Sequence, residues 1–182
     1  MNVFNGVAKR VPNAFLYVGG HTRKNAFYAR AYMTYLRARA ALLGLAGQCR
    51  CHGDYVDDRD VPGLYAASDI VAMPYRQGYS SSSGVVHQAA GLGTLMMCSK
   101  IPKFAEVGEK LSPDLLAGYG DKRAWVDSLC NLLLDEHLAG ELRERLRIFA
   151  IDTSWEHVAI QHLDLFDRLK SQVRSPRCVV VD

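Results

Sequence analysis

The sequence of 182 residues contains no apolar run that approaches the ~20 residues a helix needs to cross a membrane. Its first residues lack the basic and then apolar pattern of a secretory signal, so we expect none. Its five cysteines are an odd, scattered set that does not read as a disulfide framework. These absences favour a reducing compartment, and we expect a cytoplasmic protein.

The sequence also lacks a large excess of positive or negative charge. The chain has 22 Lys and Arg against 19 Asp and Glu, for a net charge of +3. This excess is too small and too dispersed to predict binding to nucleic acid. The basic stretch 143–147 fits the solvated face of a helix, although such a helix could also contact an anionic membrane surface. Peripheral membrane contact therefore stays open.

Metal ligands at recognisable spacing are scarce. Cys49, Cys51 and His52 are close in sequence, but no second pair of ligands follows at zinc spacing. Alternation along a strand explains this triplet equally well. We therefore predict no metal and no cofactor.

What the sequence does contain is a regular alternation of short apolar runs and helical patterns. Strands are predicted over residues 14–18, 48–52, 69–73, 94–98 and 115–119. Helices are predicted over residues 25–43, 58–67, 84–91, 122–134, 137–149 and 155–169, with a short one after Pro102. Nearly continuous apolar strands between helices indicate a parallel sheet covered on both faces, hence a doubly wound α/β fold. We assign residues 1–170 to one domain and leave the tail 171–182 unassigned.

The serine-rich stretch YSSSSGVVHQAAGLG, residues 79–93, follows one predicted strand and opens a predicted helix. In a doubly wound domain this is the carboxyl edge of the sheet, where ligands bind. The backbone N–H groups of residues 82–85 would be free donors of the first helical turn, and these favour a phosphate. A polar loop whose serines merely cap the helix explains the spacing too. Neither a Gly-x-Gly-x-x-Gly nor a Walker pattern occurs to decide between them.

The order of several weak motifs supplies a resemblance. Residues 61–107 contain a helix ending LYAASD, a strand ending in Pro, the Gly84 helix start, a helix ending in Gly, a strand and then FAEV. The later stretch IDTSWEHVAIQHLDLF and the turn Gly19-Gly20 after AFLYV belong to the same order. This succession resembles the donor-binding C-terminal half of GT-B glycosyltransferases, specifically the large retaining family 4, or glycosyl transferases group 1.

The resemblance implies a Rossmann-like single GT-B half with C-terminal helices that binds a nucleotide-diphosphate sugar for retaining glycosyl transfer. It further implies a partner, an N-terminal acceptor-binding domain or subunit, without which the chain is expected to be inactive. It implies no obligatory metal, because helix-terminal N–H groups and positive charge stabilise the departing diphosphate. The implied donor-binding residues are Tyr55, Arg76, Ser80, Ser81, Ser82, Ser83, Gly84, Val85, Gln88 and Glu106.

The chain departs from the family pattern at its two carboxylates. The family has a Glu that contacts the donor sugar and, after seven residues, a second Glu that holds the ribose. Alignment on Gly93 puts Ser80 and Gln88 at these positions. Gln88 can still hydrogen-bond a ribose diol, but Ser80 cannot replace a long, charged acceptor. A branch of the family has the pattern Ser-x-Ser-Gly-Val-x-His in this stretch. The loss of the two glutamates therefore does not by itself imply a loss of activity. The resemblance also begins after the family's first strand and its diphosphate-binding Arg and Lys.

Several roles therefore remain open. Arg76 either pairs with diphosphate or is a solvated surface residue, and Tyr55 either stacks on the nucleobase or is a surface tyrosine. Glu106 lies near the donor sugar or caps a helix. For His87 we favour a structural role, or a position at the edge of the ligand, over a role as catalytic base. The alternatives for the whole chain are a non-catalytic GT-B-derived scaffold or regulatory module, and an unrelated α/β nucleotide-binding domain.

Overall fold

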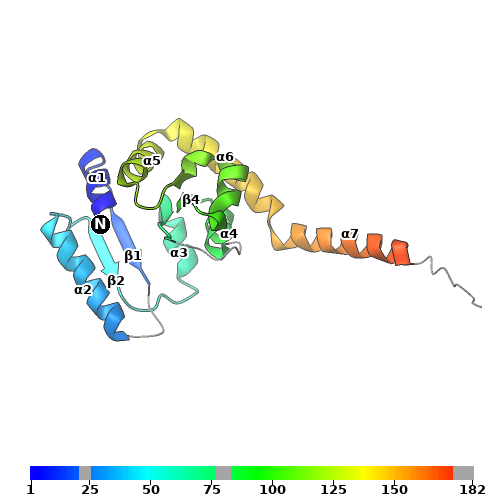
Figure 1. Ribbon diagram of the computed structural model, residues 1–182, viewed down its shortest axis with the longest axis horizontal. Coiled ribbons are helices and arrows are strands. Elements are labelled where there is room, and N and C mark those ends of the chain that lie inside the picture. Colours follow the sequence, from blue (N-terminus) through cyan, green and yellow to red (C-terminus); the bar gives the residue numbers. More distant parts are fainter. Residues whose placement is uncertain (21–25, 77–82, 174–182) are drawn as a thin grey trace, which may run out of the picture.

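The strands in the described part of the chain are all parallel. In the computed structural model, which describes residues 1–20, 26–76 and 83–173, β1 (Leu16–Gly19) pairs with β2 (Cys49–His52). A second sheet has the order β3-β4-β5, from Ile70–Met73, Leu95–Ser99 and Leu116–Ala117. Each strand lies within one or two residues of a predicted apolar run. The α/β class with parallel strands is therefore confirmed (Figure 1).

Helices separate these strands along the chain. They are α1 (Asn2–Arg10), α2 (Ala26–Leu42), α3 (Val61–Ala66), α4 (Gly84–Gly91), α5 (Lys122–Leu134), α6 (Glu136–Asp152) and α7 (Trp155–Val173). Short 3₁₀ helices at Pro102–Phe104 and Pro113–Leu115 and a π-helix at Val107–Leu111 follow β4. Gly44 adopts a φ of +72°, a left-handed conformation that suits glycine, and so ends α2 where the sequence predicted a stop.

Helix α1 was not predicted, because Gly6 interrupts its pattern and no polar side chain caps its first turn. The structure supplies the reason for this glycine. A Cβ at Gly6 would lie 2.6 Å from a methyl carbon of Val126, so the glycine lets α1 pack closely on α5. Phe4 and Val7 form the buried side of α1. Tertiary contact with α5 therefore stabilises a helix that local propensity does not favour.

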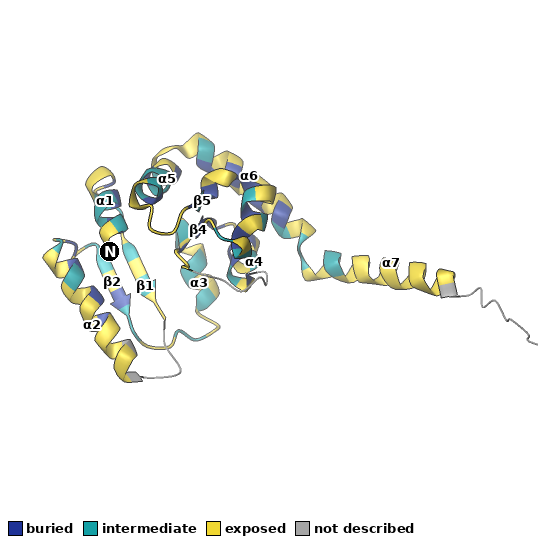
Figure 2. Ribbon diagram, in the orientation of Figure 1, coloured by how far each residue is buried: buried dark blue, intermediate teal, exposed yellow. Residues whose placement is uncertain are grey.

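The core is centred on β4, in which every residue is buried. Leu95 and Met96 lie in one cluster with residues of α4 and α6, including Val86, Ala89 and Leu142. Figure 2 shows the buried residues gathered around β4, between α4 and α6. Because both faces of β4 are covered, its side chains need no polar and apolar alternation.

The strands do not form one continuous sheet, which is where the structure differs from the sequence-based expectation. Hydrogen bonds connect β1 to β2 and connect β3, β4 and β5, and no described strand lies between the two groups. The sheet order therefore breaks at the edges of β1 and β3, where a doubly wound domain would have its central strand.

Helix α7 extends away from the rest of the molecule (Figure 1). Its apolar side chains, Trp155, Ile160, Leu163, Leu165, Phe166 and Leu169, are exposed. Residues 171–173 of the unassigned tail belong to this helix, and residues 174–182 lie outside the described part. None of the described helices has both the length and the apolar character needed to cross a bilayer.

Replacement of Leu95 by alanine tests the role of β4 in the core. Leu95 is 1% exposed, so we expect Leu95→Ala to lower the free energy of unfolding by about 2–5 kcal/mol through lost burial and a cavity. Leu134→Ala is the matched control, because Leu134 is 59% exposed and its loss should cost less than about 0.5 kcal/mol. Urea denaturation measures both, and equal losses would contradict a core centred on β4.

Candidate functional site

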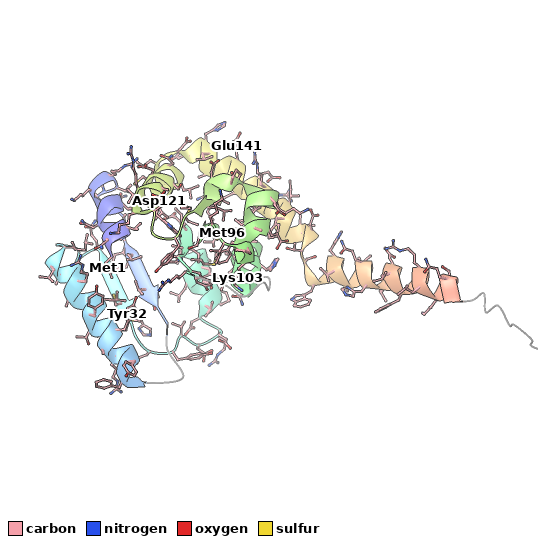
Figure 3. The ribbon with its side chains drawn as sticks, in the orientation of Figure 1. Met1, Tyr32, Met96, Lys103, Asp121 and Glu141 are labelled. Carbon is pink, nitrogen blue, oxygen red and sulfur yellow. The ribbon has the colours of Figure 1, made fainter. Side chains whose placement is uncertain are left out.

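The segments that follow β3 and β4 meet at the carboxyl edge of the second sheet. After β3 the chain continues through Pro74 and Tyr75 to Arg76, which is exposed. The ring of Tyr75 packs on Phe104, with centroids 5.3 Å apart. Phe104 belongs to the 3₁₀ helix after β4, beside Lys103, which Figure 3 labels. This ring contact holds the two segments together at the edge where a doubly wound domain binds ligands.

Helix α4 begins at this edge with an open first turn. Ser83 has extended φ and ψ of −105° and 112° and precedes the helix, and its hydroxyl makes no capping bond to the first turn. Its carbonyl accepts from the N–H of Val86 at 3.0 Å. The N–H groups of Gly84 and Val85 have no acceptor within the helix, as in any first turn. The capping alternative thus finds no support at Ser83, while Ser80, Ser81 and Ser82 lie outside the described residues.

One face of α4 is open to solvent and carries two of the predicted residues. Gly84 and Gln88 are both exposed, whereas Val86, Ala89 and Ala90 are buried against the core. Residues four apart share a helix face, so Gln88 lies one turn below the free N–H groups. A Cβ built at Gly84 meets no atom within 4 Å. The structure therefore combines Gly84 and Gln88 on one accessible surface.

His87 is on the other side of α4 and contacts α6. Its ring stacks on Phe149 with centroids 5.5 Å apart and planes at 11°. Its Nδ1 lies 3.3 Å from Oγ1 of Thr153. These contacts explain His87 as a residue that holds α4 against α6.

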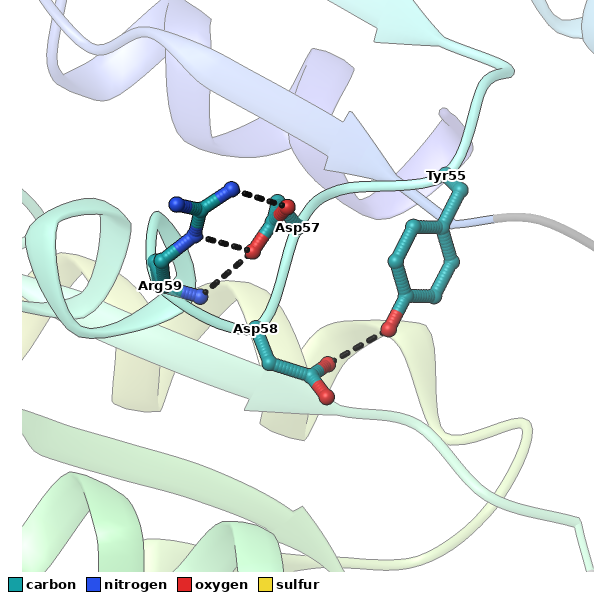
Figure 4. Close-up of polar contacts among 4 residues, drawn as sticks. All are labelled: Tyr55, Asp57, Asp58 and Arg59. Atoms are coloured by element: carbon teal, nitrogen blue, oxygen red, sulfur yellow. Dashed lines mark hydrogen bonds and ion pairs between the residues drawn. The ribbon is translucent and has the colours of Figure 1, made fainter.

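Tyr55 and Glu106 occupy other segments. Tyr55 follows β2, in the first sheet, and its hydroxyl donates to Asp58 at 2.6 Å (Figure 4). Beside it the Arg59 guanidinium hydrogen-bonds to Asp57 and lowers the pKa of that carboxyl. Glu106 is half-buried and directly precedes the π-helix. The structure brings Arg76, Gly84 and Glu106 to the carboxyl edge of the second sheet, whereas Tyr55 follows a strand of the first sheet.

Two features at the end of β4 were not singled out from the sequence. The Ser99 hydroxyl is buried and has no hydrogen-bond partner among the described residues. Burial raises the pKa of the neighbouring Cys98 thiol to about 12, so this thiol is protonated and not nucleophilic at neutral pH. A serine and a cysteine in an apolar run give no sequence signal for either property.

The other candidates have local partners. The thiols of Cys49 and Cys51 lie 3.8 Å apart, and the ring of His52 stacks on Tyr17. Within the described ranges no three His, Cys, Asp or Glu side chains converge to hold a metal. In the basic stretch 143–147, Arg145 donates to the carbonyl of Leu111 and Arg147 pairs with Glu144.

The structure is similar to sucrose-phosphate synthase from Thermosynechococcus elongatus, with a TM-score of 0.63 and 18% sequence identity. The similarity covers 94% of this chain and 42% of the synthase. The fold is thus similar to part of the GT-B glycosyltransferase fold.

The family model for glycosyl transferases group 1 matches residues 1–135. The chain is 30% identical over 135 residues to D-inositol 3-phosphate glycosyltransferase of Salinispora arenicola, and 31% identical over 124 residues to the enzyme of that name from Nocardioides sp.. These matches cover 73% and 65% of this chain, and 29% and 26% of the relatives. The chain belongs to the glycosyl transferases group 1 family and spans less than a third of these curated relatives.

The buried thiols provide a test of the packing behind this edge. Cys98 and Cys130 are fully buried, and burial raises the pKa of both, so we expect iodoacetamide at pH 8 to leave them unmodified in the folded chain. Both should react in urea, as peptide mass spectrometry can show. Modification of Cys98 in the folded chain at the rate measured in urea would mean that the end of β4 is open.

Proposed function

We propose that this chain is the donor-binding half of a retaining glycosyltransferase and binds a nucleotide-diphosphate sugar at the start of α4. The observation that carries the proposal is the extended, buried Ser83 followed by the exposed Gly84 at the carboxyl edge of the sheet. Membership of the glycosyl transferases group 1 family supports a sugar donor over other phosphate ligands.

The start of α4 suits a diphosphate for two reasons. The N–H groups of Gly84 and Val85 point out of the helix end, and the helix dipole favours negative charge there. A hydrogen bond from such a donor to an ionised oxygen contributes about 1.5–3 kcal/mol. Ser80, Ser81, Ser82 and Ser83 would add hydroxyl donors, and Arg76, in the segment from β3, would add positive charge.

The remaining predicted residues would orient the rest of the donor. Gln88, one helical turn from Gly84, would hydrogen-bond the ribose diol, and Tyr55 would stack on the nucleobase. Glu106 would lie near the sugar. Transfer itself would need an N-terminal acceptor-binding domain or subunit, since the chain covers less than a third of its relatives.

A second candidate is a non-catalytic module that kept the fold. The observation in its favour is that Ser80 and Gln88 stand where the family has two glutamates, so no carboxylate at these positions would contact the sugar or the ribose. Donor binding without transfer, in the presence of the acceptor-binding half, would favour this candidate. Glycosyl transfer in the same assay would exclude it.

Replacement of Gly84 by proline tests the diphosphate site. Proline is tolerated in the first helical turn, and the extended Ser83 already has the backbone that a residue before proline requires. The change therefore removes one N–H and keeps α4. We expect calorimetry with UDP-glucose, GDP-mannose and ADP-glucose to show binding that Gly84→Pro weakens by about ten- to hundredfold.

Gly84→Ala is the matched control for this experiment. It keeps the N–H, and its Cβ has open space, so we expect affinity within about twofold of the parent chain, the range of a neutral surface change. Circular dichroism checks that both variants retain their helices. Absence of any donor binding, or equal binding by both variants, would refute the site.

Replacement of Gln88 by alanine separates the ribose contact from the diphosphate contact. We expect Gln88→Ala to weaken ADP binding by about three- to tenfold, the value of one neutral hydrogen bond, and to leave inorganic diphosphate unchanged. Gly84→Pro should weaken both ligands. Equal effects of Gln88→Ala on ADP and diphosphate would place Gln88 at the phosphates instead of the ribose.

A further inference from the structure

Three sulfur atoms gather where β2 of the first sheet meets the start of α1. The Sγ atoms of Cys49 and Cys51 lie 3.8 Å apart, and the Cys49 thiol donates a weak hydrogen bond to the Sδ atom of Met1 at 3.9 Å. We call Met1, Cys49 and Cys51 the sulfur triad. The donor site proposed above makes no use of it.

Secondary structure positions each member of the triad. Residues two apart in a strand point to the same face, so Cys49 and Cys51 project together from β2, while Arg50 between them is exposed. Met1 directly precedes α1, and its carbonyl accepts a hydrogen bond from the N–H of Asn5 at 2.9 Å. The contact between the sulfur atoms therefore depends on the packing of α1 against β2.

The surroundings of the triad are apolar. Met1 and Cys49 pack against a cluster that includes Val7 of α1, and also against a cluster that includes Leu36 of α2. Among the described residues no three His, Cys, Asp or Glu side chains converge, so no nitrogen or carboxylate ligand completes the group. A cation bound here would be held by two thiols and a thioether.

This set of ligands selects a particular class of cation. Thiolate and thioether sulfur are soft ligands, and Cu⁺ is a soft cation that both of them bind well. Structural zinc sites almost always have four ligands from Cys, His, Asp or Glu, whereas Ca²⁺ and Mg²⁺ require oxygen. Three sulfurs in an apolar setting therefore match Cu⁺ better than any of these divalent cations.

The spacing of the sulfurs suits a three-coordinate ion. Three sulfurs in one plane around a cation, each with a metal–thiolate distance of about 2.3 Å, lie about 4.0 Å from one another. The two contacts made by Cys49 measure 3.8 Å and 3.9 Å. The side chains of the triad would thus have to move little to bind the ion.

Charge and access also fit a cation with two thiolates. Each thiol that binds Cu⁺ releases its proton to solvent, so the occupied site has a net charge of −1. The guanidinium of Arg37 donates to the carbonyl of Cys51 at 2.9 Å and brings positive charge close to this pair. No Asp or Glu occurs in residues 1–53 to oppose it. Cys49 is half-buried, so its sulfur lies close to the surface.

We propose that the sulfur triad binds one Cu⁺ ion, with the thiolates of Cys49 and Cys51 and the thioether of Met1 as ligands. Binding releases two protons and changes no oxidation state. The ion ties the start of α1 to β2, in the sheet that does not contain the start of α4. The proposal is therefore independent of donor binding, and neither one fails with the other.

A competition experiment on the full, reduced chain without oxygen tests the site. One equivalent of Cu⁺ is added in the presence of the chelator bathocuproine disulfonate, whose colour reports the copper it holds. We expect the chain to retain one Cu⁺ that excess Zn²⁺ does not displace. X-ray absorption of this complex should show three sulfur neighbours at about 2.3 Å.

Four variants separate the triad from the other thiols. Cys49→Ala and Cys51→Ala each remove a ligand, so we expect Cu⁺ affinity to fall by about a hundredfold or more, beyond the 10- to 100-fold cost of losing an outer partner. Cys98→Ala and Cys178→Ser are the matched controls, since each removes a thiol outside the triad, and affinity should stay within about twofold. Thermal unfolding without copper checks that all four fold.

Three results would overturn the proposal. The first is loss of all copper from the parent chain to the chelator, which would make the sulfur contacts packing alone. The second is equal retention of copper by Cys49→Ala and the parent chain. The third is a spectrum with only two sulfur neighbours or with nitrogen and oxygen neighbours, which would exclude Met1 or the whole triad as the ligand set.

Discussion

The burial of β4 is the constraint on which the rest of the structure depends. Its hydrogen bonds fix the register of β3 on one side and β5 on the other. Its side chains hold α4 and α6 through a shared cluster. The carboxyl edge exists because β3 and β4 end together and because the Tyr75 and Phe104 rings pack beyond those ends. The open start of α4 is thus positioned by apolar burial several residues away.

Much of the fold could be predicted from the sequence, because its signals are local. Apolar runs gave the strands, and the glycine at Gly44 gave the end of α2. Helix α6 begins one residue earlier than predicted, since Asp135 accepts a hydrogen bond from the N–H of Leu138. Helix α1 was not predicted because a glycine at position 6 disfavours a helix locally. Only the structure shows that Gly6 allows α1 to pack closely on Val126. Long-range packing decided what local pattern could not.

The candidate site was likewise predictable from the sequence only in part. The position of Gly84 and Gln88 on one helix face follows from their spacing of four, which the sequence contains. The role of His87 does not, because its partners Phe149 and Thr153 are more than sixty residues further along the chain. The buried hydroxyl of Ser99 could not be predicted either. The sequence does not show whether a serine within an apolar run finds a hydrogen-bond partner. Contacts between distant segments are therefore what sequence reasoning lacked.

The break between the sheets bears directly on donor binding. In the proposed site the phosphate-binding turn of α4 belongs to the sheet of β3, whereas Tyr55 follows β2 of the other sheet. No backbone ladder connects these two halves among the described residues, so packing of α1 and α5 against both must set their separation. Side-chain packing allows small rotations that a hydrogen-bonded strand would restrict.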